Sequence, residues 1–348
     1  MLNYRRDYMS KVITFGEIML RLSPPGYNRF IQANSFDINY GGSEANVSFS
    51  LANYNIETEF VTKLPDNEMG RATFNKLRQY GVGINHIVYG GRRLGIYYME
   101  KGASQRPSKV IYDRAFSSIS EAESCDFDWE TIFEDASWFH FSGITPALSD
   151  NLAEITLEAC IVAKSMGITI SCDLNYRSKL WTQEKANKVM TKLIKYVDVC
   201  IANEEDIEKV FDIKASDSDV DRGILNYESY KEVAREIHER FGCKYIACTL
   251  RTSISASDNK WTSLIYYGNK CYQSKEYSIH ITDRVGGGDS FVAGLIYGFM
   301  KNMNIDKTME FATAASCLKQ TIEGDFNLVT EEEVNLLANG NASGRVQR

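Results

Sequence analysis

The chain has 348 residues, of which 44% are hydrophobic and 24% are charged, as in ordinary globular enzymes. Its formal net charge of −7, without a long basic run, argues against nucleic acid and membrane surfaces as partners. It contains no run of eighteen apolar residues, and residues 1–8 lack the apolar core of a signal peptide. The eight cysteines are scattered without a CxxC pair, which predicts a reduced, cytoplasmic protein.

Short apolar runs alternate along the chain with stretches that have helical spacing of apolar residues. The apolar runs predict strands near Lys11–Gly16, Glu59–Lys63, Ser137–Phe141, Thr169–Cys172, Val197–Ile201 and Tyr245–Thr249. The helical spacing predicts helices near 43–54, 70–80, 149–166, 182–195, 229–241 and 289–302. This alternation predicts an α/β fold in three layers, with a mostly parallel central sheet flanked by helices.

Two segments interrupt the alternation, at about 18–40 and 95–118. Both are rich in β-forming residues and lack a helical period. In the second segment, Gly95–Glu100 and Lys109–Arg114 flank a turn-rich stretch, as the strands of a hairpin do. We expect these segments to form a small β-sheet lid over a cleft. We expect a single domain over residues 11–335, with flexible tails at 1–10 and 339–348.

Three consecutive glycines, Gly286–Gly288, precede Asp289 and an apolar run of helix length, Phe291–Met300. Glycines let backbone N–H groups turn toward one point, and a helix N-terminus adds partial positive charge there, which suits a phosphate. We expect Asp289 or Ser290 at or near the helix cap. The alternative is a flexible loop with a capping aspartate, which three glycines directly against a helix start make less favourable. A base beside an anion hole is what phosphoryl transfer requires.

A second glycine pair, Gly41 and Gly42, opens the helix expected from Ser43. These glycines would let a ligand approach the backbone, and Asn46 would present an amide one turn into the helix. A simple turn capped by Ser43 explains the pair better when it is taken alone.

Charged residues follow two of the expected strands, at the edge where parallel sheets bind ligands. In Asp173–Arg177, Arg177 would bind a carboxylate or phosphate through two N–H groups, although a solvent-facing loop explains this segment slightly better without other support. In Ala202–Asp206, the acids would hold hydrated Mg²⁺, and acids that favour a helix start explain the segment equally well.

Several other chemistries lack their motifs. The four histidines show neither HExxH nor paired spacing, so zinc is unsupported. No GxSxG is present for a serine hydrolase, and the first strand–helix turn lacks the GxGxxG of a dinucleotide oxidoreductase.

Together and in this order, the motifs resemble the ribokinase-like (PfkB) family of carbohydrate kinases. The stretch from Gly41 to Asn46 is similar to the N-terminal signature of that family. Asp283–Phe291 is similar to its C-terminal signature, usually Asp-Thr-Thr-Gly-Ala-Gly-Asp-Ser-Phe. The resemblance runs from about Val12 to Val334, nearly the whole chain. It implies a central sheet with helices on both sides and a β lid that closes on the sugar.

Within that family, the chain most resembles 2-keto-3-deoxygluconate kinases, through Gly16–Pro25 and Cys172–Trp181. The resemblance implies Asp289 as the catalytic base. It implies that the anion hole is formed by the backbone N–H groups of Val285, Gly286, Gly287 and Gly288. It implies that the sugar-acid pocket is lined by Gly41, Gly42, Asn46, Tyr97, Tyr112, Arg114 and Arg177. It implies that the nucleotide side or the closed site includes Asn203, Thr249, Arg251, Gly286, Gly288 and Asp325.

The sequence departs from the family pattern at a few positions. Arg284 and Val285 stand where Thr-Thr is usual, so the resemblance gives no firm basis for a monovalent-cation site of the ribokinase kind. Gly287 replaces an alanine, a change that leaves the backbone N–H in place. Asp206 stands where many relatives carry a glutamate linked to Mg²⁺, so we expect it to contact Mg²⁺ through water. Arg251 stands where many relatives carry glycine.

The implied reaction transfers the γ-phosphoryl group of ATP, with Mg²⁺, to the 6-hydroxyl of 2-keto-3-deoxygluconate. Arg114 and Arg177 favour a sugar acid over a neutral sugar, because bidentate pairing with a carboxylate is the best use of a guanidinium group. The alternatives are a fructokinase or another PfkB sugar kinase, and a non-catalytic regulator that binds a sugar acid. An exposed lid edge predicts a homo-oligomer, a dimer or larger, formed through the β lid.

Overall fold

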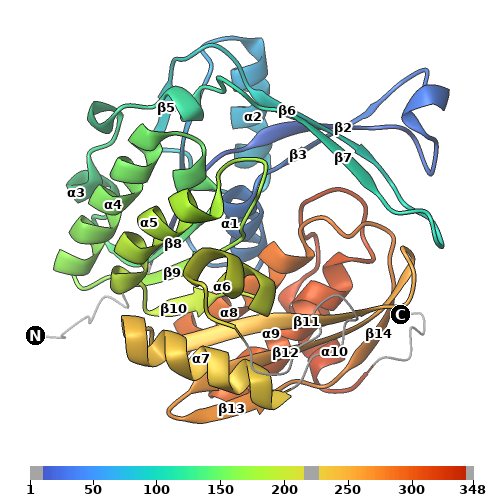
Figure 1. The fold of residues 1–348 in the computed structure, drawn as a ribbon. Coiled ribbons are helices and arrows are strands. Elements are labelled where there is room, and N and C mark those ends of the chain that lie inside the picture. Colours follow the sequence, from blue (N-terminus) through green and yellow to red (C-terminus); the bar gives the residue numbers. More distant parts are fainter. Residues whose placement is uncertain (1–10, 215–226, 342–348) are drawn as a thin grey trace, which may run out of the picture.

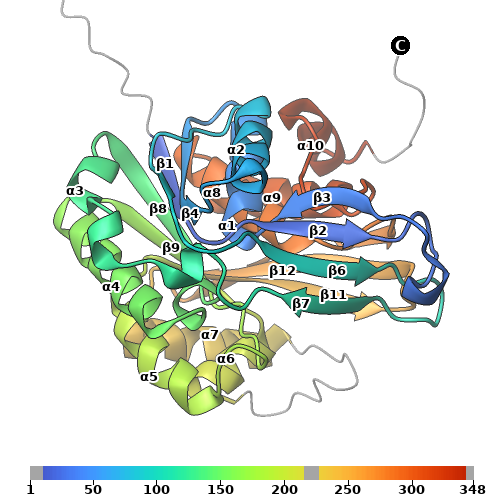
Figure 2. The ribbon, with the colours of Figure 1, turned by 90° about the horizontal axis from the view of Figure 1, so that it is seen from above.

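The computed structural model describes residues 11–214 and 227–341. Within these ranges, a ten-stranded sheet forms the main body and a four-stranded sheet lies apart from it (Figures 1 and 2). The strands of the main sheet are β1 (Lys11–Phe15), β4 (Thr58–Leu64), β5 (Ile87–Tyr89), β8 (Ala136–Ser142), β9 (Thr169–Asp173), β10 (Val199–Ile201), β11 (Tyr245–Ser253), β12 (Asp258–Tyr267), β13 (Lys270–Gln273) and β14 (Tyr277–His280).

The main sheet is parallel except at one edge. Its order is β13-β12-β11-β10-β9-β8-β1-β4-β5, and β14 pairs with β12 beside β13. Strands β5 to β11 along this order pair in parallel, whereas β12 pairs antiparallel with β11, β13 and β14. The expected fold class is therefore confirmed. The antiparallel edge differs from the expected pattern because β11 extends to Ser253 and turns directly into β12.

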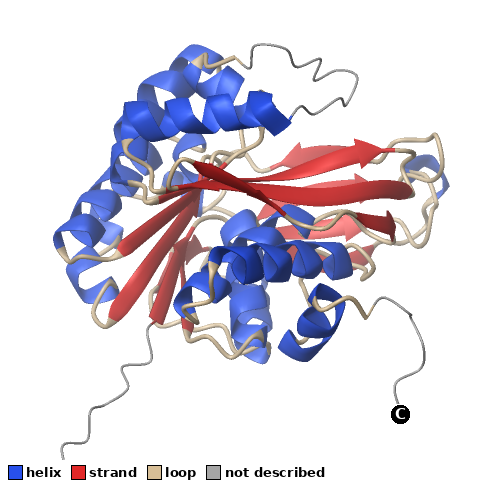
Figure 3. Ribbon diagram, turned by 90° about the horizontal axis from the view of Figure 1, so that it is seen from below, coloured by secondary structure: helices blue, strands red, loops and turns tan. Residues whose placement is uncertain are grey.

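Helices cover both faces of the main sheet (Figure 3). They are α1 (Ser43–Asn53), α2 (Glu68–Gln79), α3 (Trp129–Ile132), α4 (Asp150–Ser165), α5 (Gln183–Leu193), α6 (Glu204–Phe211), α7 (Tyr227–Phe241), α8 (Gly287–Met300), α9 (Ile305–Lys319) and α10 (Glu331–Ala338). One large apolar core packs α3 to α7 on one face of the sheet. A second core packs α1, α8, α9 and α10 on the other face. These two layers hold the carboxyl ends of the parallel strands and the N-termini of α1 and α8 around one space.

The two β-rich segments of the sequence form the separate four-stranded sheet. Its strands are β2 (Met19–Ser23), β3 (Asp37–Gly41), β6 (Gly95–Glu100) and β7 (Lys109–Asp113), in the order β3-β2-β6-β7. Strands β6 and β7 form the expected hairpin. Cross-strand partners share a face, so Arg21, Tyr97 and Tyr112 form one row across the sheet, and Leu22, Tyr98 and Ile111 form a row on the opposite face.

Helix α9 has no counterpart among the elements expected from the sequence. It is buried on most sides, from Thr308 and Met309 to Lys319, and it packs against α8. Its buried residues include the polar Thr308, Thr313, Ser316 and Lys319, so its apolar residues alone do not mark one helical face, and their spacing did not reveal the helix.

The ends of the chain add two observations. Residues 1–10 and 342–348, which make up most of the two expected tails, lie outside the described residues. At residues 339–341 the chain still turns against α10, where the N–H of Asn341 donates to the carbonyl of Leu336. In the described ranges, no helix has the length and apolar character needed to span a membrane.

Candidate active site

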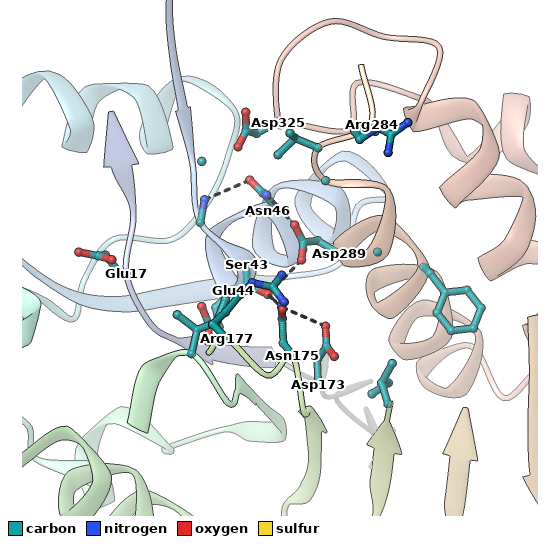
Figure 4. Close-up of a pocket in the computed structure, with 18 of the residues that line it drawn as sticks. Glu17, Ser43, Glu44, Asn46, Asp173, Asn175, Arg177, Arg284, Asp289 and Asp325 are labelled. Atoms are coloured by element: carbon teal, nitrogen blue, oxygen red, sulfur yellow. Dashed lines mark hydrogen bonds between the residues drawn. The ribbon is translucent and has the colours of Figure 1, made fainter. Parts of the chain in front are cut away.

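A cavity of 390 Å³ lies between the carboxyl ends of the parallel strands, the N-termini of α1 and α8, and one face of the small sheet. Figure 4 shows its polar residues converging from these elements. Of the residues expected on the sugar side, the cavity is lined by Gly41, Gly42, Asn46, Tyr97, Tyr112, Arg114, Arg177 and Asp289. Of those expected on the nucleotide or metal side, it is lined by Asn203, Asp206, Thr249, Gly286, Gly288 and Asp325. Arg251 and Gly287 are not among the residues that line it.

Asp289 is held by two donors from the first turns of α1. The Oγ of Ser43 donates to its Oδ1 at 3.0 Å, and the Nδ2 of Asn46 donates to its Oδ2 at 2.7 Å (Figure 4). Burial of the carboxyl group raises its pKa to about 6, although the two hydrogen bonds act in the opposite direction. The group is therefore an oriented carboxylate that is ionised at neutral pH and more basic than an ordinary aspartate.

The cap of helix α8 is a glycine that lies three residues before Asp289. Gly286 is the N-cap of α8, and Asp289 is the third residue of the helix. Gly286 has a φ of 81°, and a Cβ at this position would stand 2.1 Å from the carbonyl oxygen of Asp325. Only glycine fits both conditions. The expectation that Asp289 or Ser290 lies at or near the helix cap is confirmed in its looser form, because the cap itself is Gly286 and Asp289 lies in the first helical turn, three residues after it.

Two of the four N–H groups expected in the anion hole already have partners. The N–H of Val285 donates to the Oδ1 of Asp283 at 3.2 Å, and that of Gly287 donates to the carbonyl of Arg284 at 3.4 Å. Gly288 is the second residue of α8, where the helix itself offers no acceptor, and it lines the cavity. We call Gly286–Gly288 the glycine turn. It places the N-terminus of α8 beside the cavity, and fewer of its backbone N–H groups are available to an anion than the four that we expected.

A buried ion cluster supports the glycine turn from the side of the small sheet. Arg21 of β2 is 1% exposed and pairs with Asp283 at 2.6 Å and with Asp325 at 2.8 Å. The hydroxyl of Tyr97 also donates to Asp325. A Cβ on Gly41 would stand 1.8 Å from Oδ2 of Asp325, so this glycine makes room for that carboxylate. The cluster joins the small sheet to both sides of the turn, and neither Arg21 nor Asp283 was predicted as a site residue.

Arg114 is paired inside the protein. Its Nη2 donates to the Oε2 of Glu17, and its guanidinium lies 5.4 Å from the ring centre of Tyr112. Among the described residues, neither the Nε of Arg114 nor the Oε1 of Glu17 has a hydrogen-bond partner, although both atoms are buried. Such unsatisfied atoms are costly unless a ligand meets them. Glu17 was not among the expected site residues, because it lies after an ordinary strand.

Arg177 reaches the cavity from the loop after β9. Its Nη1 donates to the carbonyl of Tyr176 at 3.0 Å, and the side chain is otherwise exposed. In the same loop, Asn175 has a φ of 39°, and its Nδ2 lies 3.5 Å from the Oγ of Ser43 and 3.4 Å from Asp173. The strained backbone at Asn175 thus brings this loop against the first residue of α1.

Acids gather on the other side of the cavity, near α6. Burial raises the pKa of Asp173 well above its usual value, and the charges of Asp206 and Asp289 add to this effect. Burial also raises the pKa of Asp206 to about 6, and its Oδ1 accepts the N–H of Tyr176 at 3.1 Å. Asn203 caps α6 by accepting the N–H of Asp206 at 2.7 Å. A cation here would relieve the repulsion between neighbouring carboxylates.

Two arginines lie where the cavity meets β11. Arg284 lines the cavity and donates to the carbonyl of Ala256 at 3.0 Å. Burial and the nearby charge of Arg251 lower the pKa of Arg284. Arg251 itself is exposed on β11 beyond Thr249. This positive end of the cavity suits a polyphosphate. We had not predicted Arg284 as a binding residue from the sequence.

Comparison with known proteins identifies the class. The profile of the pfkB family carbohydrate kinases matches residues 9–330. The chain belongs to this family and is a carbohydrate kinase. It is 32% identical to a 2-dehydro-3-deoxygalactonokinase from Haloferax volcanii, over 96% of this chain and 98% of that protein.

Solved structures agree with this family. The crystal structure of a 2-dehydro-3-deoxygluconokinase from Thermotoga maritima is 52% identical, with a TM-score of 0.92, over 95% of this chain and 100% of that one. A pfkB family carbohydrate kinase from Listeria grayi is 35% identical, with a TM-score of 0.88, over 95% and 100% of the two chains. The fold and the family expected from the sequence are thereby confirmed.

The polar groups of the cavity fit the nucleotide and metal that such kinases use. Within the described ranges, no group of three or more His, Cys, Asp or Glu side chains could hold a metal ion by itself. Mg²⁺ needs no such cage when phosphates supply most of its ligands and one or two carboxylates supply the rest. One oxygen of Asp206 accepts the N–H of Tyr176, and contact between Asp206 and Mg²⁺ through water stays a prediction. Arg284 and the glycine turn offer positive potential for the phosphates.

Proposed function

We propose that the protein is an ATP-dependent kinase that phosphorylates the 6-hydroxyl of 2-keto-3-deoxygluconate, with Asp289 as the base. The observation that carries this proposal is the Asp289 carboxylate, oriented by Ser43 and Asn46 and directly beside the glycine turn. The names of the relatives from Haloferax volcanii and Thermotoga maritima support a substrate of the ketodeoxy sugar-acid class.

The proposed chemistry depends on positioning and charge. Phosphoryl transfer passes through a loose transition state with charge spread over the transferring oxygens, so the enzyme contributes orientation and electrostatic stabilisation. Asp289 accepts the proton of the sugar hydroxyl as the new O–P bond forms. The N–H groups at the start of α8, Gly288 foremost, stabilise negative charge that develops beside them. Mg²⁺, when bound, neutralises phosphate charge near Asp206 and Asp173.

The sugar side of the proposal depends on two arginines. The Nε of Arg114 is a buried donor with no partner among the described residues, and Arg177 extends its guanidinium from the neighbouring loop. Both would meet the carboxylate of the sugar acid. The unsatisfied Oε1 of Glu17 would accept a hydroxyl of the same ligand. A ligand with both a carboxylate for Arg114 and a hydroxyl for Glu17 would satisfy this pair. A neutral ketose offers Arg114 no anion.

We propose that the domain spans residues 11–335 and that the small sheet is a lid. Met19, Tyr97 and Met99 pack their apolar groups together next to Val285, so the sheet lies directly over the start of the glycine turn. Closure of this lid would exclude water, which otherwise competes with the sugar as the acceptor.

We propose a homo-oligomer formed through the outer face of the lid. There, the row of Leu22, Tyr98 and Ile111 continues to Ile38 on β3, and Ile38 and Ile111 are 62% and 54% exposed. A second copy of the chain would bury this apolar row. Within the described ranges the cysteines form no disulfide, which supports a reducing compartment, and we propose the cytoplasm.

The experiment that tests the function measures ADP release with ATP and Mg²⁺ across a panel of acceptors. The panel contains 2-keto-3-deoxygluconate, 2-keto-3-deoxygalactonate, fructose and ribose. We expect kcat/KM to be at least about 100-fold higher for one or both ketodeoxy acids, which corresponds to two charged contacts of moderate strength. Higher activity with fructose would favour a fructokinase. Tight binding of a sugar acid without ADP release would favour a regulator.

A further inference from the structure

The glycine turn rests on the C-terminal end of α9. The Oγ of Ser316 donates to the carbonyl of Gly287 at 2.7 Å. The N–H groups of Thr282 and Asp283 donate to the carbonyl of Gln320 at 2.9 and 3.2 Å. Residues at the end of one helix therefore hold both the glycine turn, at Gly287, and the chain that leads into it, at Thr282 and Asp283.

Lys319 is the last residue of α9 and also lies next to the glycine turn, with its ammonium group buried. It is 0% exposed, and its Nζ donates to the carbonyls of Ile322 at 3.2 Å and Asp283 at 3.5 Å. A Cβ on Gly286 would stand 3.1 Å from its Cε, the carbon that carries the ammonium group. The ammonium group therefore lies against the glycine turn, and Lys319 is not among the residues that line the cavity.

The ammonium group has no acid of its own among the residues that the structure describes. Within the described parts of the chain, no carboxylate forms an ion pair with Lys319, and Asp283 and Asp325 both pair with Arg21. Burial lowers the pKa of Lys319, while the charges of Asp283 and Asp325 act against that shift. An ammonium buried in this way is costly, and an apolar side chain of similar length would fill the space at a lower cost.

Two explanations account for a charge at this position. A lysine in the last turn of a helix interacts favourably with the helix carbonyls, and that effect alone would stabilise the fold. The alternative is electrostatic. A fixed cation behind backbone N–H groups strengthens their attraction for an anion in front, most of all in a site from which water is excluded.

We propose that Lys319 is a positioning residue of the phosphoryl-transfer site and serves as its built-in cation. Its ammonium group donates to the backbone carbonyls of Asp283 and Ile322. Carbonyl oxygens are also the groups that coordinate K⁺ in proteins. Lys319 raises the positive potential of the glycine turn when negative charge develops there. Turnover then needs no added monovalent cation. This inference rests on the proposed kinase function and assigns a part of that site.

The first test uses the unaltered protein. Initial rates with ATP, Mg²⁺ and the ketodeoxy acid are measured in potassium, sodium and tetramethylammonium chloride at equal ionic strength. We expect kcat values within about twofold of one another. A rise of tenfold or more in potassium would overturn the inference while leaving the kinase function intact. Absence of turnover in every salt would contradict the kinase function and this inference with it.

The second test removes the charge. Lys319→Met should lower kcat by about 10- to 100-fold, a smaller loss than removal of a direct oxyanion donor, with KM for the sugar acid within about threefold. Lys319→Ala, which leaves space, should regain part of its kcat in potassium or ammonium chloride. Lys192→Met, in the last turn of α5, is the control for loss of a helix-terminal lysine and should keep full kcat. A folded Lys319→Met with unchanged kcat would overturn the inference.

Discussion

Asn46 donates a hydrogen bond to Asp289 across 2.7 Å and so joins the first turn of α1 to the first turn of α8. With Ser43, it fixes both carboxylate oxygens of a group that burial makes more basic. The two helices come from opposite ends of the chain, and their N-termini meet beside the glycine turn. This contact gives the site its orientation, and it leads to the first two predictions.

The first prediction concerns pH. A base must be deprotonated to act, so kcat/KM should be constant above about pH 7 and should fall tenfold per unit below about pH 6, where Asp289 takes up its proton. The measurement is kcat/KM for the ketodeoxy acid from pH 5 to 9. Because burial also raises the pKa of Asp206 to about 6, the same profile is recorded for Asp206→Asn. Loss of the acid limb in that variant would assign the limb to Asp206 and contradict the prediction.

The second prediction concerns Asn46. Its hydrogen bond lowers the pKa of Asp289, so Asn46→Ala should move the acid limb of kcat/KM to higher pH. The rate at neutral pH should also fall, because the carboxylate loses one of its two orienting donors. Ser43→Ala is the matched variant and should move the limb in the same direction. A limb that stays in place in both variants would show that these contacts do not control the base.

The third prediction concerns the acid group of the substrate. Arg114→Ala should raise KM for the ketodeoxy acid by about 10- to 100-fold, the equivalent of one charged hydrogen bond, and should raise KM for fructose much less. The single change leaves Glu17 as an unpaired buried acid, so Glu17→Gln with Arg114→Ala is the matched variant. Equal effects on the acid and the neutral sugar would rule out contact between Arg114 and the substrate carboxylate.

The fourth prediction concerns assembly. Ile38→Glu, on the outer face of the lid, should convert a dimer or larger oligomer into a monomer, because a charge directly within an apolar contact is strongly unfavourable. The molar mass in solution, measured by light scattering after size-exclusion chromatography, checks this result. Ile161→Glu, an exposed position on α4, is the control and should leave the mass unchanged. A wild-type protein that is monomeric at all concentrations would refute the proposed interface.

Local signals predicted much of the fold. Apolar runs gave β1, β4, β8, β9 and β10 within one or two residues at most ends, and helical spacing gave α1, α4 and α8 similarly. The glycine turn and the helix after it were also evident, because glycines and an apolar run are adjacent in the sequence. The cap at Gly286 was not evident, because aspartate is a preferred capping residue and the left-handed turn is set by the packing of Asp325.

The contacts that build the site could not be read from the sequence. Ser43 and Asp289 are 246 residues apart, Arg21 and Asp325 are 304 apart, and Glu17 and Arg114 are 97 apart. Pairs at such separations leave no periodic or local pattern. The resemblance to the family placed Asn46, Arg114 and Asp289 around one ligand. The structure adds Ser43 as a second donor to Asp289, and Glu17 as the partner of Arg114.

The base assignment is tested most directly by Asp289→Asn, which keeps the size of the side chain and removes its basicity. The measurement is the single-turnover rate of ADP formation with ATP, Mg²⁺ and 2-keto-3-deoxygluconate, together with the Kd of the sugar acid by calorimetry. We expect the rate to fall by about 10²- to 10⁴-fold while the Kd stays within about threefold. A rate within threefold of that of the unaltered protein would contradict the account of Asp289 as the base.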